Sequence, residues 1–226
     1  MSNDLNNIDF NDDETIEYKL ILIGDTSVGK TTLFKKITSG EFLPRNVSTI
    51  GVDRKALTFI CEFEEKGQKV SKNIMVFLTD TAGQEKYKSI TKSYYKGSNG
   101  VILLYDITDK KSFDHVNSWM ESIKNSVETY EENKCSLFLL GTKLDLVEED
   151  EKKRAVTVEE AQKKCKELEL EWGGECSSKD FSDDKYKELF KEFIIKIYNK
   201  IGYNKIQRET ISISNSHKRK KKSKCC

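Results

Sequence analysis

The 226-residue sequence predicts an α/β fold with a mostly parallel six-stranded sheet, one antiparallel edge strand and helices on both faces. Apolar segments of strand length alternate with segments of helical periodicity, which is the pattern of a parallel sheet covered by helices. One pair of strand-like segments breaks this alternation, because the polar, glycine-containing stretch between them is too short for a crossover helix. We therefore expect that pair to form an antiparallel hairpin at one edge of the sheet.

Six strands are predicted along the chain. The first predicted strand is a strongly apolar segment that ends in glycine, and the last has a weaker strand pattern. None approaches the roughly 20 apolar residues that a helix needs to span a bilayer. The predicted strands cover residues 18–24, 56–63, 73–78, 100–107, 135–142 and 170–176.

Helices are expected between these strands, and the first two cover residues 30–38 and 112–130. The second has one apolar face, because its large apolar side chains recur at spacings of three and four residues. The members of that face are Phe113, Val116, Trp119, Met120 and Ile123.

Two further helices are predicted in the last third of the chain. Residues 157–168 open with Thr157 and have Glu160 three positions later, which is the pattern of a capping box. Residues 183–202 end at Gly202, a typical helix stop. The charged stretch 147–154 lies before these helices, and we expect an enlarged surface loop there.

Charge divides the chain into three parts, although its net charge is only +1. Residues 1–17 carry six acidic side chains and no Lys or Arg, so we expect an acidic, disordered N-terminal arm. Residues 18–202 are the predicted folded domain, and residues 203–226 are a predicted flexible tail with six basic side chains between positions 218 and 224. A nearly neutral domain argues against a body coated for nucleic acid.

The cysteines favour a reducing compartment. The N-terminus is acidic and lacks the apolar stretch of a signal peptide, so we expect a cytosolic protein. Four internal cysteines lie far apart without a C-x-x-C spacing, and we interpret them as buried thiols rather than zinc ligands or disulfides. They are Cys61, Cys135, Cys165 and Cys176.

The segment GDTSVGKT, residues 24–31, fits the pattern G-x-x-x-x-G-K-[ST] between a predicted strand and a predicted helix. Glycines in such a loop let backbone N–H groups point at phosphate oxygens, and the helix that follows adds its positive N-terminal end. Lys30 supplies charge for the β- and γ-phosphates, and the Thr31 hydroxyl is a ligand for Mg²⁺. The predicted phosphate-binding residues are Asp25, Thr26, Ser27, Val28, Gly29, Lys30, Thr31 and Thr32.

A second motif, DTAGQE, follows the predicted strand 73–78. Asp80 is placed to hold Mg²⁺ through water, Gly83 to bring its N–H to a terminal phosphate, and Gln84 to orient an attacking water. This motif resembles the second switch of Ras-superfamily GTPases, and STIGVD, residues 48–53, resembles their first switch. The resemblance implies a P-loop NTPase fold. It also implies that Thr49 binds Mg²⁺ and approaches the γ-phosphate.

Base recognition is predicted from two later segments, GTKLD and CSSK. Asp145 can accept two hydrogen bonds from guanine N1–H and its 2-amino group, whereas adenine lacks both donors and would leave a carboxylate unpaired. The aliphatic stem of Lys143 can lie against the base. The resemblance adds an aromatic contact from Phe42, and it aligns three further residues with the guanine-binding S-A-K segment of the family: Ser177, Ser178 and Lys179.

Within the superfamily the sequence is most similar to Rab proteins, over about residues 18–202 and in its terminal Cys-Cys. It departs from them at several positions. Thr142 stands where Asn is usual, which keeps a hydroxyl but loses an amide. Arg54 and Thr79 replace two of three aromatic residues that form the effector surface, while the third matches Tyr94. These replacements leave the Rab subtype open.

The basic tail and its two terminal cysteines allow two interpretations. A nuclear-import or RNA-binding patch explains the basic run but not Cys225 and Cys226. In a cytosolic GTPase the pair resembles a Rab prenylation site that receives two geranylgeranyl groups, and two lipid chains hold a protein stably to a bilayer. Basic side chains add attraction to an anionic leaflet. We favour the membrane interpretation.

The resemblance implies a membrane-attached GTP/GDP switch that hydrolyses GTP to regulate intracellular vesicle trafficking on the cytoplasmic face of endomembranes, with a cytosolic pool. Mg²⁺ is the implied cofactor. The implied partners are an exchange factor, a GTPase-activating protein, a GDP-dissociation inhibitor, the prenylation escort machinery and effectors, without nucleic acid. Two alternatives remain: a GTP-loaded tether that barely hydrolyses, and a nuclear GTPase that does not touch lipid.

Overall fold

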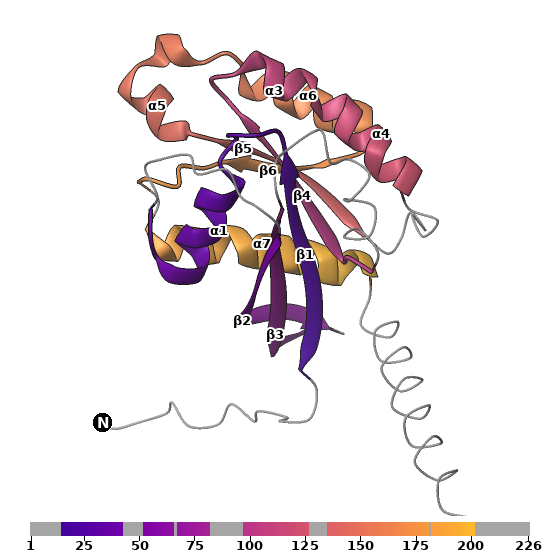
Figure 1. Ribbon diagram of the computed structural model, residues 1–226. Helices are drawn as coiled ribbons and strands as arrows, with labels where there is room; N and C mark the ends of the chain where they lie inside the picture. The colour runs from indigo at the N-terminus through magenta and orange to yellow at the C-terminus, as the bar shows by residue number, and fades with distance from the viewer. Residues whose placement is uncertain are drawn as a thin grey trace, which may run out of the picture.

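The computed structural model describes residues 15–42, 52–65, 67–81, 97–126, 135–180 and 182–201. They form a six-stranded sheet in the order β2-β3-β1-β4-β5-β6 (Figure 1). The strands are β1 (Ile16–Gly24), β2 (Val52–Glu65), β3 (Gln68–Thr81), β4 (Gly100–Asp106), β5 (Ser136–Thr142) and β6 (Glu171–Glu175).

The pairing confirms the predicted topology. β1, β3, β4, β5 and β6 pair in parallel, and only the edge strand β2 runs antiparallel to its neighbour β3. β4 and β5 are buried along their whole length, as expected for central strands covered on both faces. Because the strands are parallel, the ends of β1, β3, β4, β5 and β6 meet at one edge of the sheet, where ligands of open α/β sheets bind.

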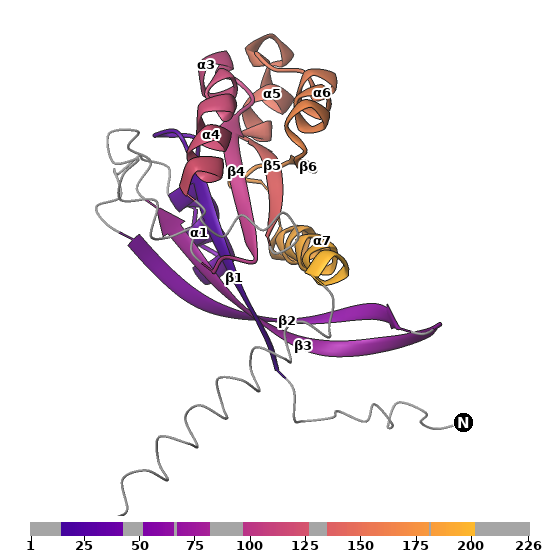
Figure 2. The ribbon, with the colours of Figure 1, turned by 90° about the vertical axis from the view of Figure 1, so that its right-hand side faces the viewer.

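Helices cover both faces of the sheet (Figures 1 and 2). On one face α1 (Lys30–Ser39) and α7 (Asp183–Ile201) pack on a core that includes Leu33, Phe138 and Phe193. On the other face α3 (Lys110–Asp114), α4 (Val116–Ser126) and α6 (Val158–Leu168) pack on a core that includes Leu103 and Trp119. The helical layers predicted on both faces of the sheet are therefore confirmed.

The structure differs from the prediction in several places. β1 begins at Ile16, which is buried and pairs with Ile74, two residues before the expected start. The predicted helix 112–130 is divided into α3 and α4 at His115, and residues 127–134 lie outside the described residues. The expected surface loop, residues 147–154, instead includes the end of α5 (Leu144–Glu149) and the short 3₁₀ helix η2 (Glu151–Lys153). Cys135 is partly exposed, whereas the other three described cysteines are buried as predicted.

The hairpin of β2 and β3 is longer than predicted, since the polar stretch between the two strand-like segments is itself paired as far as Glu65 and Gln68. Its end extends past the rest of the sheet, and β2 crosses beneath α7 on the way (Figure 2). There the Phe63 and Tyr198 rings lie 4.0 Å apart between centroids, and the Tyr198 hydroxyl donates a hydrogen bond to Glu65. The extension is therefore packed against the last helix.

The capping box that opens α6 is confirmed, because Thr157 Oγ1 accepts from the Glu160 N–H and the Glu160 carboxylate accepts from the Thr157 N–H. Gly202, the predicted stop of the last helix, lies outside the described residues, and α7 is described to Ile201. In the part of the chain that the structure describes, no helix is long and apolar enough to cross a membrane.

Candidate nucleotide-binding site

The phosphate loop connects β1 to α1 and has a left-handed backbone at both ends. Gly24 has φ +138°, and a Cβ atom there would lie 2.3 Å from the Leu104 carbonyl oxygen, so only glycine fits. Gly29 has φ 97° and precedes the first residue of α1. The turn brings the N-terminus of α1 beside the end of β1, which is the arrangement expected for anion binding by backbone N–H groups.

Lys30 is buried at the start of α1 and points back into this loop. Its Nζ donates to the carbonyl oxygens of Gly24 at 2.9 Å and Asp25 at 2.5 Å. A buried ammonium fixed beside helix N–H groups is suited to a polyphosphate.

Asp80 lies on β3 opposite Leu22 of β1 and is fully buried. Neither carboxylate oxygen forms a hydrogen bond of ordinary geometry with any described residue. Burial raises the pKa of Asp80, and the side chain of Thr31 and the charge of Lys30 act in the opposite direction. A buried carboxylate near a threonine hydroxyl fits a hard, oxygen-seeking cation such as Mg²⁺. No cluster of three or more His, Cys, Asp or Glu in the described ranges could hold a metal alone.

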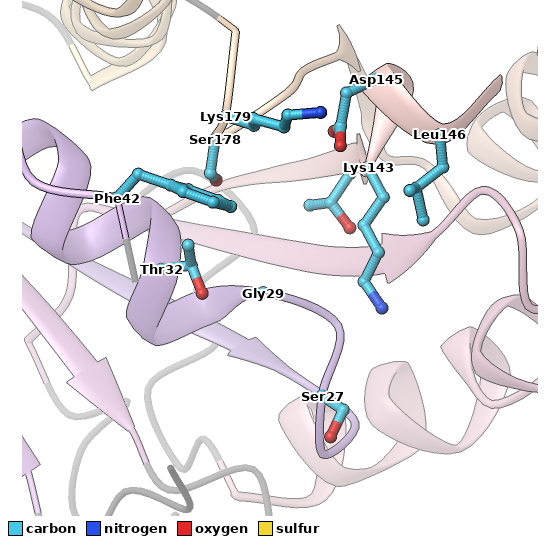
Figure 3. Close-up of a pocket in the computed structure, with 10 residues that line it drawn as sticks. Ser27, Gly29, Thr32, Phe42, Lys143, Asp145, Leu146, Ser178 and Lys179 are labelled. Atoms are coloured by element: carbon cyan, nitrogen blue, oxygen red, sulfur yellow. The ribbon is translucent and has the colours of Figure 1, made fainter. Parts of the chain in front are cut away.

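A pocket beside the phosphate loop collects the residues predicted to bind the base (Figure 3). Phe42 follows α1, Lys143 and Asp145 follow β5, and Ser178 and Lys179 follow β6. The full lining is Ser27, Gly29, Thr32, Phe42, Thr142, Lys143, Asp145, Leu146, Ser178 and Lys179. Residues from three distant segments thus converge on one site that continues into the loop.

The Thr142 hydroxyl connects the two parts of this site. Its Oγ1 lies 2.6 Å from the Val28 carbonyl oxygen and 2.9 Å from that of Tyr105, so one proton serves two backbone acceptors. Val28 belongs to the phosphate loop, and its side chain is buried in the core. Thr142, which stands where Asn is usual, keeps a hydroxyl. That hydroxyl is the hydrogen-bond donor at the joint between the loop and β5.

Backbone and side-chain hydrogen bonds also fix the loop after β6. The Leu144 N–H donates to the Cys176 carbonyl at 3.1 Å, and the Cys176 N–H donates to Gly141 at 2.8 Å. Ser177 Oγ accepts from the N–H groups of Lys179 and Asp180, at 3.2 and 3.0 Å. The Ser177 side chain thus shapes the turn that presents Ser178 and Lys179, and it does not line the pocket itself.

Comparison with known proteins agrees with this geometry. The Ras family model matches residues 19–199. Rab-13 of Rattus norvegicus is 34% identical over 209 residues, which cover 92% of this chain and 95% of that protein. SEC4 of Saccharomyces cerevisiae is 33% identical over 214 residues, 92% of this chain and 90% of that protein. The GTP-binding protein ypt2 of Schizosaccharomyces pombe is 39% identical over 150 residues, 66% and 67% of the two chains.

The chain belongs to the Ras family. Rab-13 and SEC4 are among its relatives, and it is a Rab-like small GTPase that hydrolyses GTP and acts in vesicle trafficking. The Ras-like fold predicted from the motifs is confirmed.

Several predicted site residues of this Rab-like GTPase fall outside the described residues. They are Thr49, Gly83, Gln84, Cys225 and Cys226. Tyr94 of the predicted effector surface also lies there. The other two positions of that surface face each other across β2 and β3, as the pair Arg54 and Thr79. Arg54 lies over the Phe77 ring, with its guanidinium carbon 4.3 Å from the ring centroid, so a cation covers this part of the GTPase.

Sequence reasoning missed three contacts around the GTPase site. Lys143 has a left-handed backbone, φ 65°, and its Nζ lies 2.6 Å from Oδ2 of the buried Asp106, so its aliphatic stem crosses the pocket wall. Arg154 forms two hydrogen bonds with Glu175, at 2.7 and 2.8 Å, just before the CSSK loop. Leu146 adds an apolar contact to the base pocket. Asp106 could have been found as the acid at the end of a buried strand.

A further set of contacts that sequence reasoning missed holds Asp25. Its Oδ1 accepts from the Trp119 indole N–H at 2.7 Å, and its Oδ2 lies 2.5 Å from His115 Nδ1. Trp119 and His115 come from the α3–α4 segment, so the phosphate loop of this GTPase is bonded to the helical layer on the face of the sheet opposite α1.

Proposed function

We propose that the pocket binds GTP and GDP with the base between Phe42 and the stem of Lys143 and with the phosphates in the loop 24–31. The observation that carries this proposal is the convergence of Phe42, Lys143, Asp145 and Ser178 on one pocket that also includes Gly29. Asp145 is nearly buried in the first turn of α5, where its carboxylate can accept from guanine N1–H and the 2-amino group. Adenine would leave that buried acceptor without donors, which favours guanine.

The phosphate end of the site supplies positive charge and backbone donors. Lys30 and the N-terminus of α1 stabilise negative charge on the β- and γ-phosphates. Thr31 and Asp80 are the described residues that fit Mg²⁺, and Thr49 would complete the set. When bound, Mg²⁺ neutralises charge that develops between the phosphates.

Gln84 orients the attacking water in this proposal, and a cation from an activating protein accelerates the reaction. Loss of the γ-phosphate releases Thr49 and Gly83, so the two switch segments change state with the nucleotide. Exchange factors, effectors and a GDP-dissociation inhibitor are the partners that such a switch requires.

The test of this mechanism is Gln84→Leu. We expect GTP binding to stay within about twofold, since Gln84 does not hold the nucleotide, and turnover stimulated by a cell extract to be lost. Single-turnover phosphate release measures both basal and stimulated rates. Gln162→Leu, at an exposed position of α6, is the matched control and leaves both rates unchanged. Stimulated turnover that survives in the Gln84 variant would contradict the assignment.

A GTP-loaded tether that barely hydrolyses is the second candidate. One observation favours it: Ser27 stands in the phosphate loop with φ 66° and lines the pocket, where a side chain can disturb the position of an attacking water. The same phosphate-release assay separates the candidates, because a tether would show no stimulation by extract in the natural chain.

Attachment to membranes is proposed from the tail, whose Cys225 and Cys226 are suited to two prenyl groups and whose basic run is suited to an anionic leaflet. We expect a tagged full-length chain to lie on the cytoplasmic face of endomembranes, with a cytosolic pool. The Cys225→Ser/Cys226→Ser chain should be cytosolic. Mass spectrometry of the C-terminal peptide is the independent measurement, and unmodified cysteines in cells would instead support a nuclear GTPase.

A further inference from the structure

The phosphate loop has an external attachment that the hydrolysis mechanism does not use. Asp25 is the first loop residue after β1, and its carboxylate is absent from the lining of the nucleotide pocket. Both of its oxygens are instead directed to the α3–α4 segment, where they meet the Trp119 indole N–H and His115 Nδ1. We call these three residues the Asp25 clamp.

The two donors of the clamp are fixed by different means. Trp119 is 3% exposed and packs in the core between α4 and the sheet, so its indole N–H has little freedom. His115 stands at the joint of α3 and α4, where its N–H donates to Lys111 and its carbonyl accepts from the Trp119 N–H. Hydrogen bonds to a carboxylate are stronger than neutral ones, and a fixed buried donor adds directional restraint.

The clamp is connected directly to the phosphate-binding lysine. The carbonyl oxygen of the same Asp25 accepts from Lys30 Nζ at 2.5 Å, and the Gly24 carbonyl accepts at 2.9 Å. Any movement of Asp25 therefore moves a carbonyl that holds the ammonium. The loop has left-handed residues at Gly24, Ser27 and Gly29, and the clamp adds a restraint from outside to this local conformation.

We propose that Trp119 and His115 are positioning residues for GTP and GDP retention, which act by fixing Asp25 and, through its carbonyl, Lys30. The proposal rests on the assignment of residues 24–31 to the phosphates. It predicts that loss of either donor accelerates nucleotide release, since the ammonium would then be held in a broader range of positions. It also predicts that α4 senses the nucleotide, because the clamp joins the two.

Trp119→Phe is the test that removes the indole donor and keeps an aromatic ring. Release of fluorescent GDP should accelerate about tenfold, the effect expected for losing one hydrogen bond to a charged group. Trp172→Phe is the matched control, because Trp172 packs against the same core from the edge strand β6. Release rates that are equal in the two variants would overturn the proposal.

His115→Leu and His115→Asn give a second, milder pair at a half-exposed position where folding is not at risk. We expect release to accelerate about fivefold in the leucine variant and to stay near the natural rate in the asparagine variant, which still offers an N–H donor. Equal acceleration in both variants would contradict positioning by a hydrogen bond.

Nuclear magnetic resonance supplies a readout that a purely structural role would not move. The indole N–H proton of Trp119 should resonate downfield while it is bonded to the carboxylate, shift upfield in Asp25→Asn, and shift when GDP is exchanged for a GTP analogue. A resonance that stays unchanged in Asp25→Asn would overturn the clamp. If the natural chain fails to bind GTP at all, the proposed site fails, whereas GTP binding with unchanged release in Trp119→Phe refutes the clamp alone.

Discussion

The two halves of the nucleotide site are built in different ways. The proposed phosphate half is one continuous stretch, residues 24–31, in which Lys30 is hydrogen-bonded to carbonyl groups of the loop itself. The base half is assembled from three segments that are far apart in the sequence, with Phe42, Asp145 and Ser178 as representatives. Thr142 joins them through the Val28 carbonyl.

This difference determines how each half can fail. A continuous loop keeps its shape through local backbone conformation, so changes there act on strain and on the Asp25 clamp. A pocket assembled from several segments depends on hydrogen bonds and ion pairs between them. A single substitution there can therefore detach one loop from the others. Substitutions in the base half should therefore cost more than conservative ones in the phosphate half, and the following experiments test that order.

The largest effect is expected for Asp145→Ala in the base half. Asp145 is the acceptor proposed for two guanine donors, and their loss should weaken GDP binding by about a thousandfold. Isothermal titration calorimetry measures the affinity. Glu148→Ala, which removes an exposed acid from the same helix α5, is the control and should bind normally. A loss below tenfold for Asp145→Ala would refute its role.

The second effect is expected for Arg154→Met, which breaks the pair with Glu175 behind the CSSK loop. Glu175 would keep a nearly buried carboxylate without its partner, so unfolding free energy should fall by about 2 kcal/mol. Urea denaturation is the measurement. Lys187→Met removes an exposed pair with Asp184 and should change stability by less than about 0.5 kcal/mol. Equal losses would mean that the Arg154 pair is only a surface contact.

Thr142→Val tests the joint between the two halves. It leaves two buried carbonyls, of Val28 and Tyr105, without their hydroxyl donor, so stability should fall by about 1–2 kcal/mol. GDP release should accelerate because both halves move apart. Thr142→Ser keeps the hydroxyl and should stay close to the natural chain in both measurements. If valine and serine behave alike, the hydroxyl does not join the halves.

The smallest effect, and one of opposite sign, is expected for Ser27→Gly in the phosphate half. Ser27 has a left-handed backbone, and glycine removes about 1 kcal/mol of strain there. Thermal denaturation should show a modest gain. Glu169→Gly is the control, since Glu169 has a left-handed backbone at the end of α6, far from the loop. Both should stabilise, but only Ser27→Gly should change phosphate release. A loss of stability in Ser27→Gly would mean that the Ser27 hydroxyl stabilises the folded state by more than the backbone strain destabilises it.

The phosphate half and the base half were predicted by different kinds of reasoning. Residues 24–31 are contiguous, so their pattern carries both the turn and its chemistry. Asp80, Thr142 and Ser177 lie at or just after the ends of β3, β5 and β6, and the predicted parallel order of strands brings these ends to one edge of the sheet. The base residues became a pocket in the prediction only through resemblance to a family.

No local sequence pattern indicated the contacts between distant segments. Asp25 and Trp119 are 94 residues apart, and the tryptophan fits a helical apolar face whether or not its N–H finds a carboxylate. Arg154 fell in a stretch that we interpreted as a surface loop, since its charged residues resemble solvent-exposed sequence. The break between α3 and α4 was missed because residues 112–126 keep one apolar periodicity through His115.

The packing of the β2–β3 hairpin on α7 has a mechanical consequence. Tyr198 lies one turn before Ile201, the last described residue of the helix, and it contacts both Phe63 and Glu65 near the far end of the hairpin. Tension applied to the chain beyond Ile201 would reach these contacts before it reached the middle of the helix. The pull would then pass along the edge strand toward Val52, so a load on the C-terminus is shared between α7 and the edge of the sheet.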